Sequence, residues 1–280
     1  MRSSSLLLAF ILVSQCACAR DAYISLNDGA KLHIASTGRG QPLVFIPGWT
    51  MTRRFFEKQE AHFSSTHHVV TYDPRGQGRS DKTAGGNTYA DHANDLRQIL
   101  LQRDLRDVVV VGWSSGCLTI YEYIRRFGFD RIQKLVFVDE PPKWIGDAST
   151  EWVYGTFDDY RRTLQDLVSR RAEPDGIIDW MLKRPVSPDV RAWMNEEMRK
   201  TRPQTALSLF VDGLAADFTP EVARIDVPAL FMIRSEQVAK AEAWLKPIRP
   251  AIQVVAISSH AMFWEEPEAF NAMLSAFLGR

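Results

Sequence analysis

The sequence predicts an α/β fold: a mostly parallel sheet flanked by helices, with an inserted group of helices. Short apolar runs that suit buried strands alternate with amphipathic helical patterns. This alternation is typical of parallel strands joined by right-handed crossovers. The strand pattern stops between about residues 143 and 215, where only helical patterns occur, and then resumes. Hydrophobic residues make up 45% of the 280 residues, which is ample for a buried core.

The predicted strands begin with a hairpin. Residues 22–26 and 32–36 alternate in polarity on either side of Asn27-Asp28-Gly29, a sequence typical of tight turns. The later strands are apolar on both faces, as expected in the middle of a sheet that helices cover. They are predicted at residues 43–46, 68–72, 108–111, 135–138, 229–233 and 253–257.

The predicted helices fall into two groups. Those that alternate with the strands are expected at residues 53–63, 89–103, near 239–245, and 267–277. Those of the insertion, which prolines punctuate, are expected at residues 151–170, 174–183, 188–200 and 203–213. The insertion carries half of the eight tryptophans, namely Trp144, Trp152, Trp180 and Trp193. We interpret residues 143–215 as a helical cap whose aromatic side chains are shared between packing against the sheet and lining an apolar pocket.

Charge and ligand patterns exclude several function classes. Lysine and arginine together number 34, and so do aspartate and glutamate. Nothing therefore favours binding to nucleic acid or to an anionic membrane surface. No two histidines stand at metal-ligand spacing with carboxylates, and no cysteine cluster remains after the N-terminal segment. Neither a metal nor another cofactor is expected.

The N-terminus resembles an export signal. Arg2 precedes an apolar run, residues 6–13, that is too short to span a bilayer, and Ala17-Cys18-Ala19 is a small-residue cleavage site. We expect residues 1–19 to be removed as a signal peptide. The mature chain would then begin at Arg20, have no membrane span and be periplasmic or secreted. A buried N-terminal helix, an uncleaved anchor and a lipoprotein, suggested by the cysteines after the apolar run, are the alternatives.

A Gly-x-Ser-x-Gly sequence stands between a predicted strand and a predicted helix. Residues 108–111, all valine, lead into Gly112-Trp113-Ser114-Ser115-Gly116, after which apolar residues recur three or four apart. This context predicts a nucleophile elbow, in which the glycines let strand and helix approach around a strained serine. Ser114 is the predicted nucleophile. The Ser115 amide lies at a helix N-terminus, where it can meet a developing oxyanion. An ordinary structural turn is the alternative.

Two further loops follow predicted strands. Pro47-Gly48-Trp49 comes after strand 43–46, and ligands of α/β sheets bind where loops leave the carboxyl ends of strands. The Trp49 amide is therefore a candidate second oxyanion donor. His260 follows the last predicted strand, a placement that the other five histidines lack, and is the candidate general base.

With Ser114, His260 and the Pro47-Gly48-Trp49 loop in order, the chain resembles the α/β-hydrolase family over nearly all of its mature length. The resemblance implies that Ser114 is the nucleophile and His260 the base, and that the Trp49 and Ser115 amides form the oxyanion hole. The glycine-rich loop at residues 73–81 resembles the family's arginine-glycine loop, which is a structural match.

The resemblance also implies the domain organisation. The family has an eight-stranded, mostly parallel sheet, with a cap that follows the sixth strand. Carried onto this sequence, residues 20–142 and 216–280 form the core and residues 143–215 form the helical cap.

The acid departs from the family pattern. Most members carry an aspartate in a turn after the seventh strand, but residues 234–238 read Arg-Ser-Glu-Gln-Val, with valine at the usual acid position. Asp139, at the end of the sixth strand, is the favoured replacement, because that strand end also faces the histidine loop. Some haloalkane dehalogenases, and the cofactor-free dioxygenases that open hydroxyquinolone rings, place their acid there. Glu236 and Glu140 are the alternative acids.

These residues predict an exported serine hydrolase that cleaves a small carboxylic ester or lactone through a Ser-His-Asp triad and an acyl-enzyme. The chain also resembles esterases and non-haem chloroperoxidases around residues 112–117 and 138–142. A cofactor-free dioxygenase is one alternative, although those enzymes carry a histidine where this chain has Ser115. A ligand-binding protein descended from a hydrolase is another.

Overall fold

The structure is a computed structural model that describes residues 20–169 and 175–279. The predicted signal peptide, residues 1–19, lies outside the described residues, as do residues 170–174 and residue 280. Within the two described ranges, no helix combines the length and the apolar character needed to cross a membrane.

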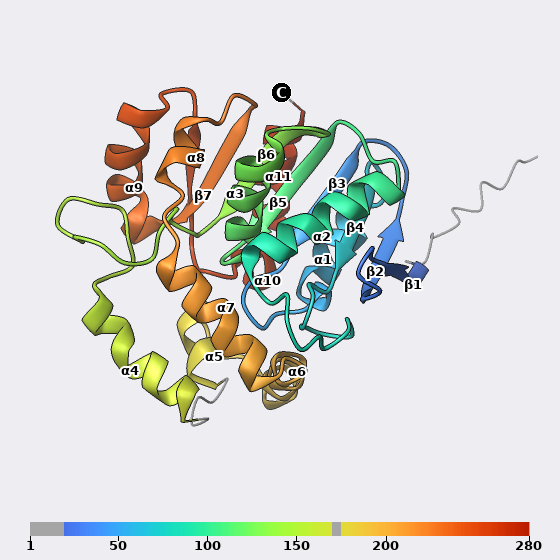
Figure 1. The fold of residues 1–280 in the computed structure, drawn as a ribbon. Coiled ribbons are helices and arrows are strands. Elements are labelled where there is room, and N and C mark those ends of the chain that lie inside the picture. The colour runs from blue at the N-terminus through green and yellow to red at the C-terminus, as the bar shows by residue number, and fades with distance from the viewer. Residues whose placement is uncertain (1–19, 170–174, 280) are drawn as a thin grey trace, which may run out of the picture.

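One sheet of eight strands runs through the described chain, which confirms the predicted fold class (Figure 1). Its strand order is β1-β2-β4-β3-β5-β6-β7-β8. β2 pairs antiparallel with β1 and β4, whereas the other neighbouring strands are parallel. The strands are β1 (Arg20–Ser25), β2 (Lys31–Thr37), β3 (Pro42–Ile46), β4 (His68–Tyr72), β5 (Val108–Trp113), β6 (Ile132–Val138), β7 (Ala229–Arg234) and β8 (Gln253–Ile257).

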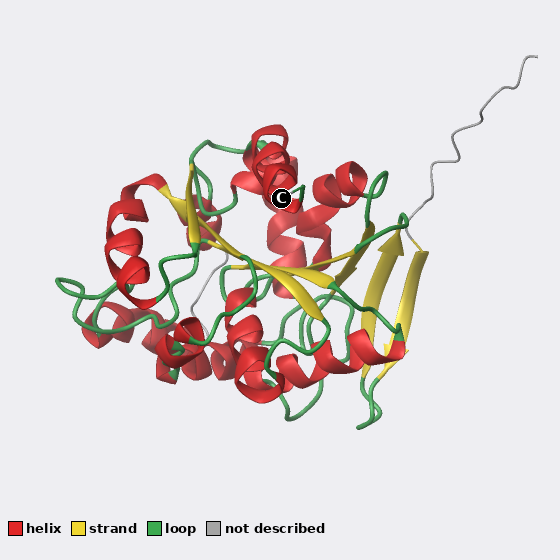
Figure 2. Ribbon diagram, turned by 90° about the horizontal axis from the view of Figure 1, so that it is seen from above, coloured by secondary structure: helices red, strands yellow, loops and turns green. Residues whose placement is uncertain are grey.

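Helices cover both faces of the sheet, which Figure 2 shows from above. One buried cluster joins the sheet to α2 (Tyr89–Gln102), α3 (Gly116–Phe127), α8 (Thr219–Ala223) and α9 (Ser235–Ile248). A second cluster joins it to the 3₁₀ helix η1 (Arg53–Phe56), α1 (Glu57–Phe63), α10 (Met262–Glu265) and α11 (Pro267–Leu278). The helix predicted at residues 53–63 thus begins as a 3₁₀ turn.

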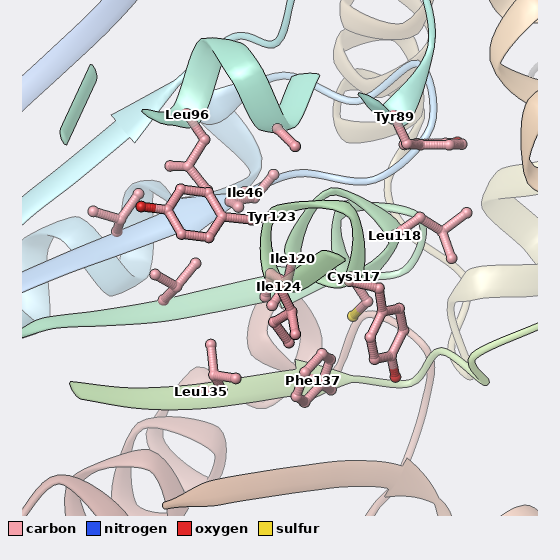
Figure 3. Packing of buried hydrophobic residues seen from close by; sticks show 14 of the residues in the cluster. Ile46, Tyr89, Leu96, Cys117, Leu118, Ile120, Tyr123, Ile124, Leu135 and Phe137 are labelled. Atoms are coloured by element: carbon pink, nitrogen blue, oxygen red, sulfur yellow. The ribbon is translucent and has the colours of Figure 1, made fainter. Parts of the chain in front are cut away.

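The central strand β5 is buried on both faces. Val108 and Val110 belong to the first cluster, and Val109 and Val111 belong to the second. A fully buried valine side chain contributes roughly 2 kcal/mol, so this run holds the strand firmly in place. Figure 3 shows α3 against the sheet on one side, with Cys117, Ile120 and Ile124 on the side of the helix toward Leu135 and Phe137 of β6. The sequence between β5 and α3 is therefore fixed from both ends.

Four longer helices lie between β6 and β7 and gather at the bottom of the view in Figure 1. They are α4 (Phe157–Val168), α5 (Asp175–Met181), α6 (Pro188–Arg199) and α7 (Pro203–Ala215). The helix predicted from residue 151 begins later, at Phe157, because the Asp159 carboxylate accepts the backbone N–H of Thr156 at 2.7 Å. That contact makes Thr156 the N-cap.

The four tryptophans of the predicted cap differ in their surroundings. Trp144 and Trp152 are buried in the first cluster. Trp193 stacks on Trp264 of α10 at 4.9 Å between ring centroids. Trp180 is 50% exposed, and it borders the cavities described below.

Candidate active site

Ser114 occupies a strained turn between β5 and α3. Its φ is 52°, in the left-handed region that a residue with a side chain seldom adopts. Its backbone N–H donates to the carbonyl of Val138 at 2.9 Å. A Cβ at Gly116 would lie 2.5 Å from the Ile46 carbonyl oxygen, and a Cβ at Gly48 would lie 2.9 Å from the Ser114 Cβ. Glycine at these two positions therefore lets α3 and the residue 47–49 loop close around the serine.

His260 and Asp139 form a buried pair near this turn. His260 follows β8 and Asp139 follows β6, and the His260 Nδ1 lies 2.6 Å from the Asp139 Oδ2. His260 is 2% exposed and Asp139 is 3% exposed. The indole Nε1 of Trp113, the residue before the serine, donates to the His260 carbonyl at 2.8 Å. The elbow therefore holds the histidine loop directly.

The surroundings favour a charged Asp139 and a neutral His260 at pH 7. Burial acts to raise the pKa of Asp139, but the hydrogen bond from His260, its charge and the Arg234 guanidinium outweigh it. The pKa of Asp139 therefore lies below its ordinary value. Burial lowers the pKa of His260 in spite of the neighbouring carboxylate. A neutral imidazole held by a carboxylate at Nδ1 is the form that accepts a proton at Nε2.

The two alternative acids make other contacts. Glu236 is exposed in the first turn of α9, where its carboxylate lies 3.7 Å from the Arg234 Nη1. Glu140 is buried, and it accepts hydrogen bonds from the Trp144 Nε1 at 2.5 Å and the Tyr154 hydroxyl at 2.6 Å. Its burial raises the pKa of Glu140 to about 8. Of the three predicted carboxylates, the structure brings Asp139 to His260.

Two cavities meet at Ser114. A cavity of about 70 Å³ is lined by both Ser114 and His260. A larger pocket of about 690 Å³ is lined by Ser114, Ser115 and Trp49, and also by Glu140 and Arg234. Its aromatic lining comprises Trp49, Trp144, Tyr154, Tyr160, Trp180 and Phe210. The predicted nucleophile thus opens onto a pocket with six aromatic residues in its lining, whereas His260 borders the smaller cavity.

Both predicted oxyanion donors border the pocket. Ser115 immediately precedes α3, and in the described chain neither its amide nor that of Trp49 donates a hydrogen bond to another residue. The Trp49 indole Nε1 donates to the Ala206 carbonyl of α7 at 2.8 Å. This contact ties the loop to the helices between β6 and β7.

Sequence analysis missed Gln77, which braces the same loop. Its buried side chain donates to the carbonyls of Gly48 at 3.1 Å and Met51 at 2.7 Å, and it accepts the Thr50 N–H at 3.1 Å. Gln77 belongs to the glycine-rich loop at residues 73–81, for which a structural role was predicted. Through Gln77, that loop holds the backbone of the loop that contains Trp49. Arg234 and Trp180 were also missed as neighbours of His260. For Arg234 a signal was available in the sequence, because it stands at the end of a predicted strand, next to the strand that ends at Asp139.

Within the part of the chain that the structure describes, no group of three or more histidine, cysteine, aspartate or glutamate side chains is arranged to hold a metal ion.

The chain is similar to known proteins over most of its length. A model of the alpha/beta hydrolase fold matches residues 41–267. The pimeloyl-[acyl-carrier protein] methyl ester esterase of Vibrio cholerae is 26% identical over 87% of this chain and 96% of its own length. A non-heme chloroperoxidase of Streptomyces lividans is 26% identical over 91% of this chain and 98% of its own. The crystal structure of a bromoperoxidase from Bacillus anthracis matches with a TM-score of 0.84 at 25% identity, covering 93% of this chain and 100% of that one.

Proposed function

Because this chain belongs to the α/β-hydrolase fold family, we propose that it hydrolyses a small carboxylic ester or lactone at Ser114. One observation carries the proposal: His260, whose Nδ1 lies 2.6 Å from the buried Asp139 Oδ2, borders the same cavity as a serine held at a positive φ. The Vibrio cholerae relative named above is an ester hydrolase, which supports acyl transfer as the chemistry.

The proposed reaction has two halves. The Ser114 Oγ attacks the substrate carbonyl while the His260 Nε2 takes the hydroxyl proton and Asp139 stabilises the imidazolium. The Trp49 and Ser115 amides donate to the oxyanion, each contributing on the order of 3 kcal/mol. The imidazolium then gives its proton to the leaving alkoxide, and an acyl-enzyme remains. Water, deprotonated by His260, attacks the acyl group, and its proton passes to the Ser114 oxygen as the bond breaks.

The pocket suits an apolar or aromatic substrate part. Its lining is rich in tryptophan, tyrosine and phenylalanine, which provide large apolar surfaces with a few polar ends. A volume of about 690 Å³ lies in the range of small-molecule sites. We therefore propose small esters or lactones with an apolar or aromatic group as the substrate class.

A p-nitrophenyl ester series from acetate to octanoate tests the proposal. We expect the full chain to hydrolyse part of the series and Ser114→Ala to lose that activity. Ser169→Ala, which changes an exposed serine at the end of α4, should keep it. The acyl length with the highest kcat/KM then sizes the pocket.

No hydrolysis by the wild-type chain across the series would contradict the proposal. Oxygen uptake with a hydroxy-heteroaromatic compound would then favour the cofactor-free dioxygenase. Binding of such a compound without oxygen uptake, and without labelling by a fluorophosphonate, would favour the ligand-binding protein.

We also propose that the protein is exported and that residues 1–19 are its signal peptide, on the strength of the apolar run and the Ala-Cys-Ala sequence. Expression of the whole chain in a bacterial host should yield a protein that starts at Arg20 outside the cytoplasm. A chain that retains Met1 and stays in the cytoplasm would contradict this proposal.

A further inference from the structure

Arg234, the last residue of β7, makes two contacts with Asp139. Its backbone N–H donates to the Asp139 Oδ1 at 3.0 Å, and its side-chain Nε donates to the Oδ2 at 2.5 Å. The Oδ2 also receives the His260 Nδ1. One carboxylate oxygen therefore lies between the histidine and the arginine, and the other is fixed by the backbone of the neighbouring strand.

Trp180 of α5 contacts both ends of this arrangement. Its ring centroid lies 4.8 Å from the Arg234 guanidinium carbon and 4.3 Å from the His260 ring centroid. Asp139, Arg234, Trp180 and His260 thus form a closed set of contacts, each touching the next. Such a set restrains every member, because no side chain can rotate without losing two partners.

The register of the sheet places Arg234 close to Asp139. β6 and β7 are parallel neighbours with Val138 beside Met232, so Asp139 projects from the sheet one strand away from the residues after β7. The family pattern places the acid after the seventh strand, at the position that Arg234 and the following residues occupy. From this position at the end of β7, Arg234 reaches the Asp139 carboxylate with both its backbone N–H and its side chain.

We propose that Arg234 is a positioning residue for the reaction: it holds the Asp139 carboxylate against His260 and contributes a positive charge beside the pair. This inference rests on the function proposed above. Arg234 acts through Asp139 and is assigned no contact with the reacting atoms of the substrate. The distal Nη1 lies 3.7 Å from the exposed Glu236, a weak surface contact that competes little with Asp139.

The charge of Arg234 has a measurable consequence. The charged groups that act on His260 are Asp139 at the end of β6 and Arg234 at the end of β7, while Trp113 and Trp180 pack against its ring without charge. Burial is the largest cause that lowers the pKa of His260, and the arginine lowers it further. Removing the arginine's charge leaves Asp139 unopposed and raises the pKa of His260.

The experiment compares three variants of the full chain: Arg234→Met, Arg234→Lys and Arg125→Met. Arg125 is a matched control because it makes two hydrogen bonds to Glu221, at 3.0 and 3.1 Å, and lies 4.6 Å from the Phe218 ring, in a different part of the fold. Both methionine variants therefore lose an arginine–carboxylate pair and a cation–π contact. Only one of them loses contact with Asp139.

We expect Arg234→Met to lower kcat about 10²-fold, the cost of a misplaced catalytic group, with little change in KM for a neutral ester. The acid limb of its kcat/KM profile should move to higher pH. Arg234→Lys, which keeps a charge, should keep the wild-type acid limb and recover part of kcat. Arg125→Met should lose thermal stability and keep the wild-type kcat per folded molecule and the wild-type acid limb.

The inference is overturned if Arg234→Met keeps the wild-type kcat and acid limb, or if its loss equals that of Arg125→Met once folded protein is counted by active-site titration. A loss confined to KM for an anionic ester such as p-nitrophenyl hemisuccinate also overturns it, because the arginine would then bind substrate.

An NMR titration of His260 tests the role of Arg234 independently of the proposed function. If the wild-type chain hydrolyses no ester, the proposed function fails, but the pKa of His260 can still be followed by NMR. A higher pKa in Arg234→Met than in wild type would support the coupling of Arg234 to the pair, and an unchanged pKa would refute it.

Discussion

Among the residues that the structure describes, two buried histidine–aspartate pairs lie in two regions of the sheet. His260 and Asp139 meet at 2.6 Å beyond β6 and β8, and His33 of β2 and Asp73 after β4 meet at 3.0 Å. In both pairs the Nδ1 faces a carboxylate Oδ2, and all four residues are almost completely buried. By distance and burial alone, the two pairs are nearly equivalent.

The two pairs differ in what the second ring nitrogen of each histidine, Nε2, faces. The Nε2 of His33 lies 3.4 Å from a second carboxylate, that of Asp21. Asp73 also accepts the backbone N–H groups of Arg53 at 2.8 Å and Arg79 at 2.7 Å, which fastens two loops. His260 instead borders the cavity that Ser114 shares. A histidine–aspartate pair therefore indicates catalysis only where the second ring nitrogen can reach a nucleophile.

The largest expected difference comes from removing one charge in each pair. Asp139→Asn should lower kcat for a p-nitrophenyl ester on the order of 10⁴-fold, because the amide no longer holds the reactive tautomer of His260. Asp73→Asn should leave kcat per folded molecule within experimental error and lower the thermal unfolding midpoint. Steady-state kinetics and thermal unfolding of both variants check this. A large loss of kcat in Asp73→Asn, with kcat unchanged in Asp139→Asn, would mean that the His33–Asp73 pair and not the His260–Asp139 pair serves the reaction.

The pH dependence sharpens the comparison at the first pair. His260 must be neutral to accept a proton, and burial holds its pKa below the ordinary value of 6.5. Activity should therefore be at its plateau at pH 7 and fall about tenfold per unit as pH drops below the pKa of His260. The acid limb of kcat/KM measures that pKa. An acid limb at or above pH 6.5 would contradict a desolvated base.

Glu140 extends the comparison to a carboxyl group that faces no histidine. Because burial raises its pKa from 4.5 to about 8, the folded protein binds a proton that the unfolded chain has lost between those pH values. Its contribution to stability is present below pH 4.5 and is lost as pH rises toward 8, by up to about 1.4 kcal/mol per pH unit. Wild type should therefore lose stability relative to Glu140→Gln from pH 5 to 8 in urea unfolding. Parallel curves for the two proteins would refute this.

Glu236 should show the smallest effect. It is exposed, and its contact with Arg234 at 3.7 Å resembles a surface ion pair, which contributes roughly 0–1 kcal/mol. Glu236→Gln should leave kcat and KM unchanged within error and shift the unfolding midpoint little. A large fall in kcat would make Glu236, and not Asp139, the acid of the pair.

The sheet and the elbow were predictable because both depend on local sequence. Four consecutive valines fit a strand buried on two faces. The glycines around Ser114 are required because a Cβ at Gly48 or Gly116 would lie within 3 Å of a neighbouring atom. The choice of Asp139 over Glu236 was also within reach, because it depends only on which strand ends lie side by side. Helix starts depend on single side chains and were harder to predict. The helix expected from residue 151 begins at Phe157, since one side chain, Asp159, caps it.

The surroundings of His260 were not predictable in the same way. Trp180 reaches the histidine only through the folded path of the helices between β6 and β7, and no periodic pattern encodes that contact. Arg234 stands at a strand end, but its two hydrogen bonds to Asp139 depend on the exact spacing of neighbouring strands. The same limit applies to Gln77, whose amide spans the backbone of another loop. Such contacts arise from tertiary structure alone.

The most direct test of the account is the rate at which a fluorophosphonate labels the protein, with the modified residue identified by peptide mapping. Only a serine activated by a neighbouring base reacts quickly. We predict rapid labelling of Ser114 in wild type and in Asp73→Asn, and labelling slowed by orders of magnitude in Asp139→Asn. Labelling of Ser114 that is equally fast in all three proteins, or absent from wild type, would contradict the claim that the pair at β6 and β8 activates this serine.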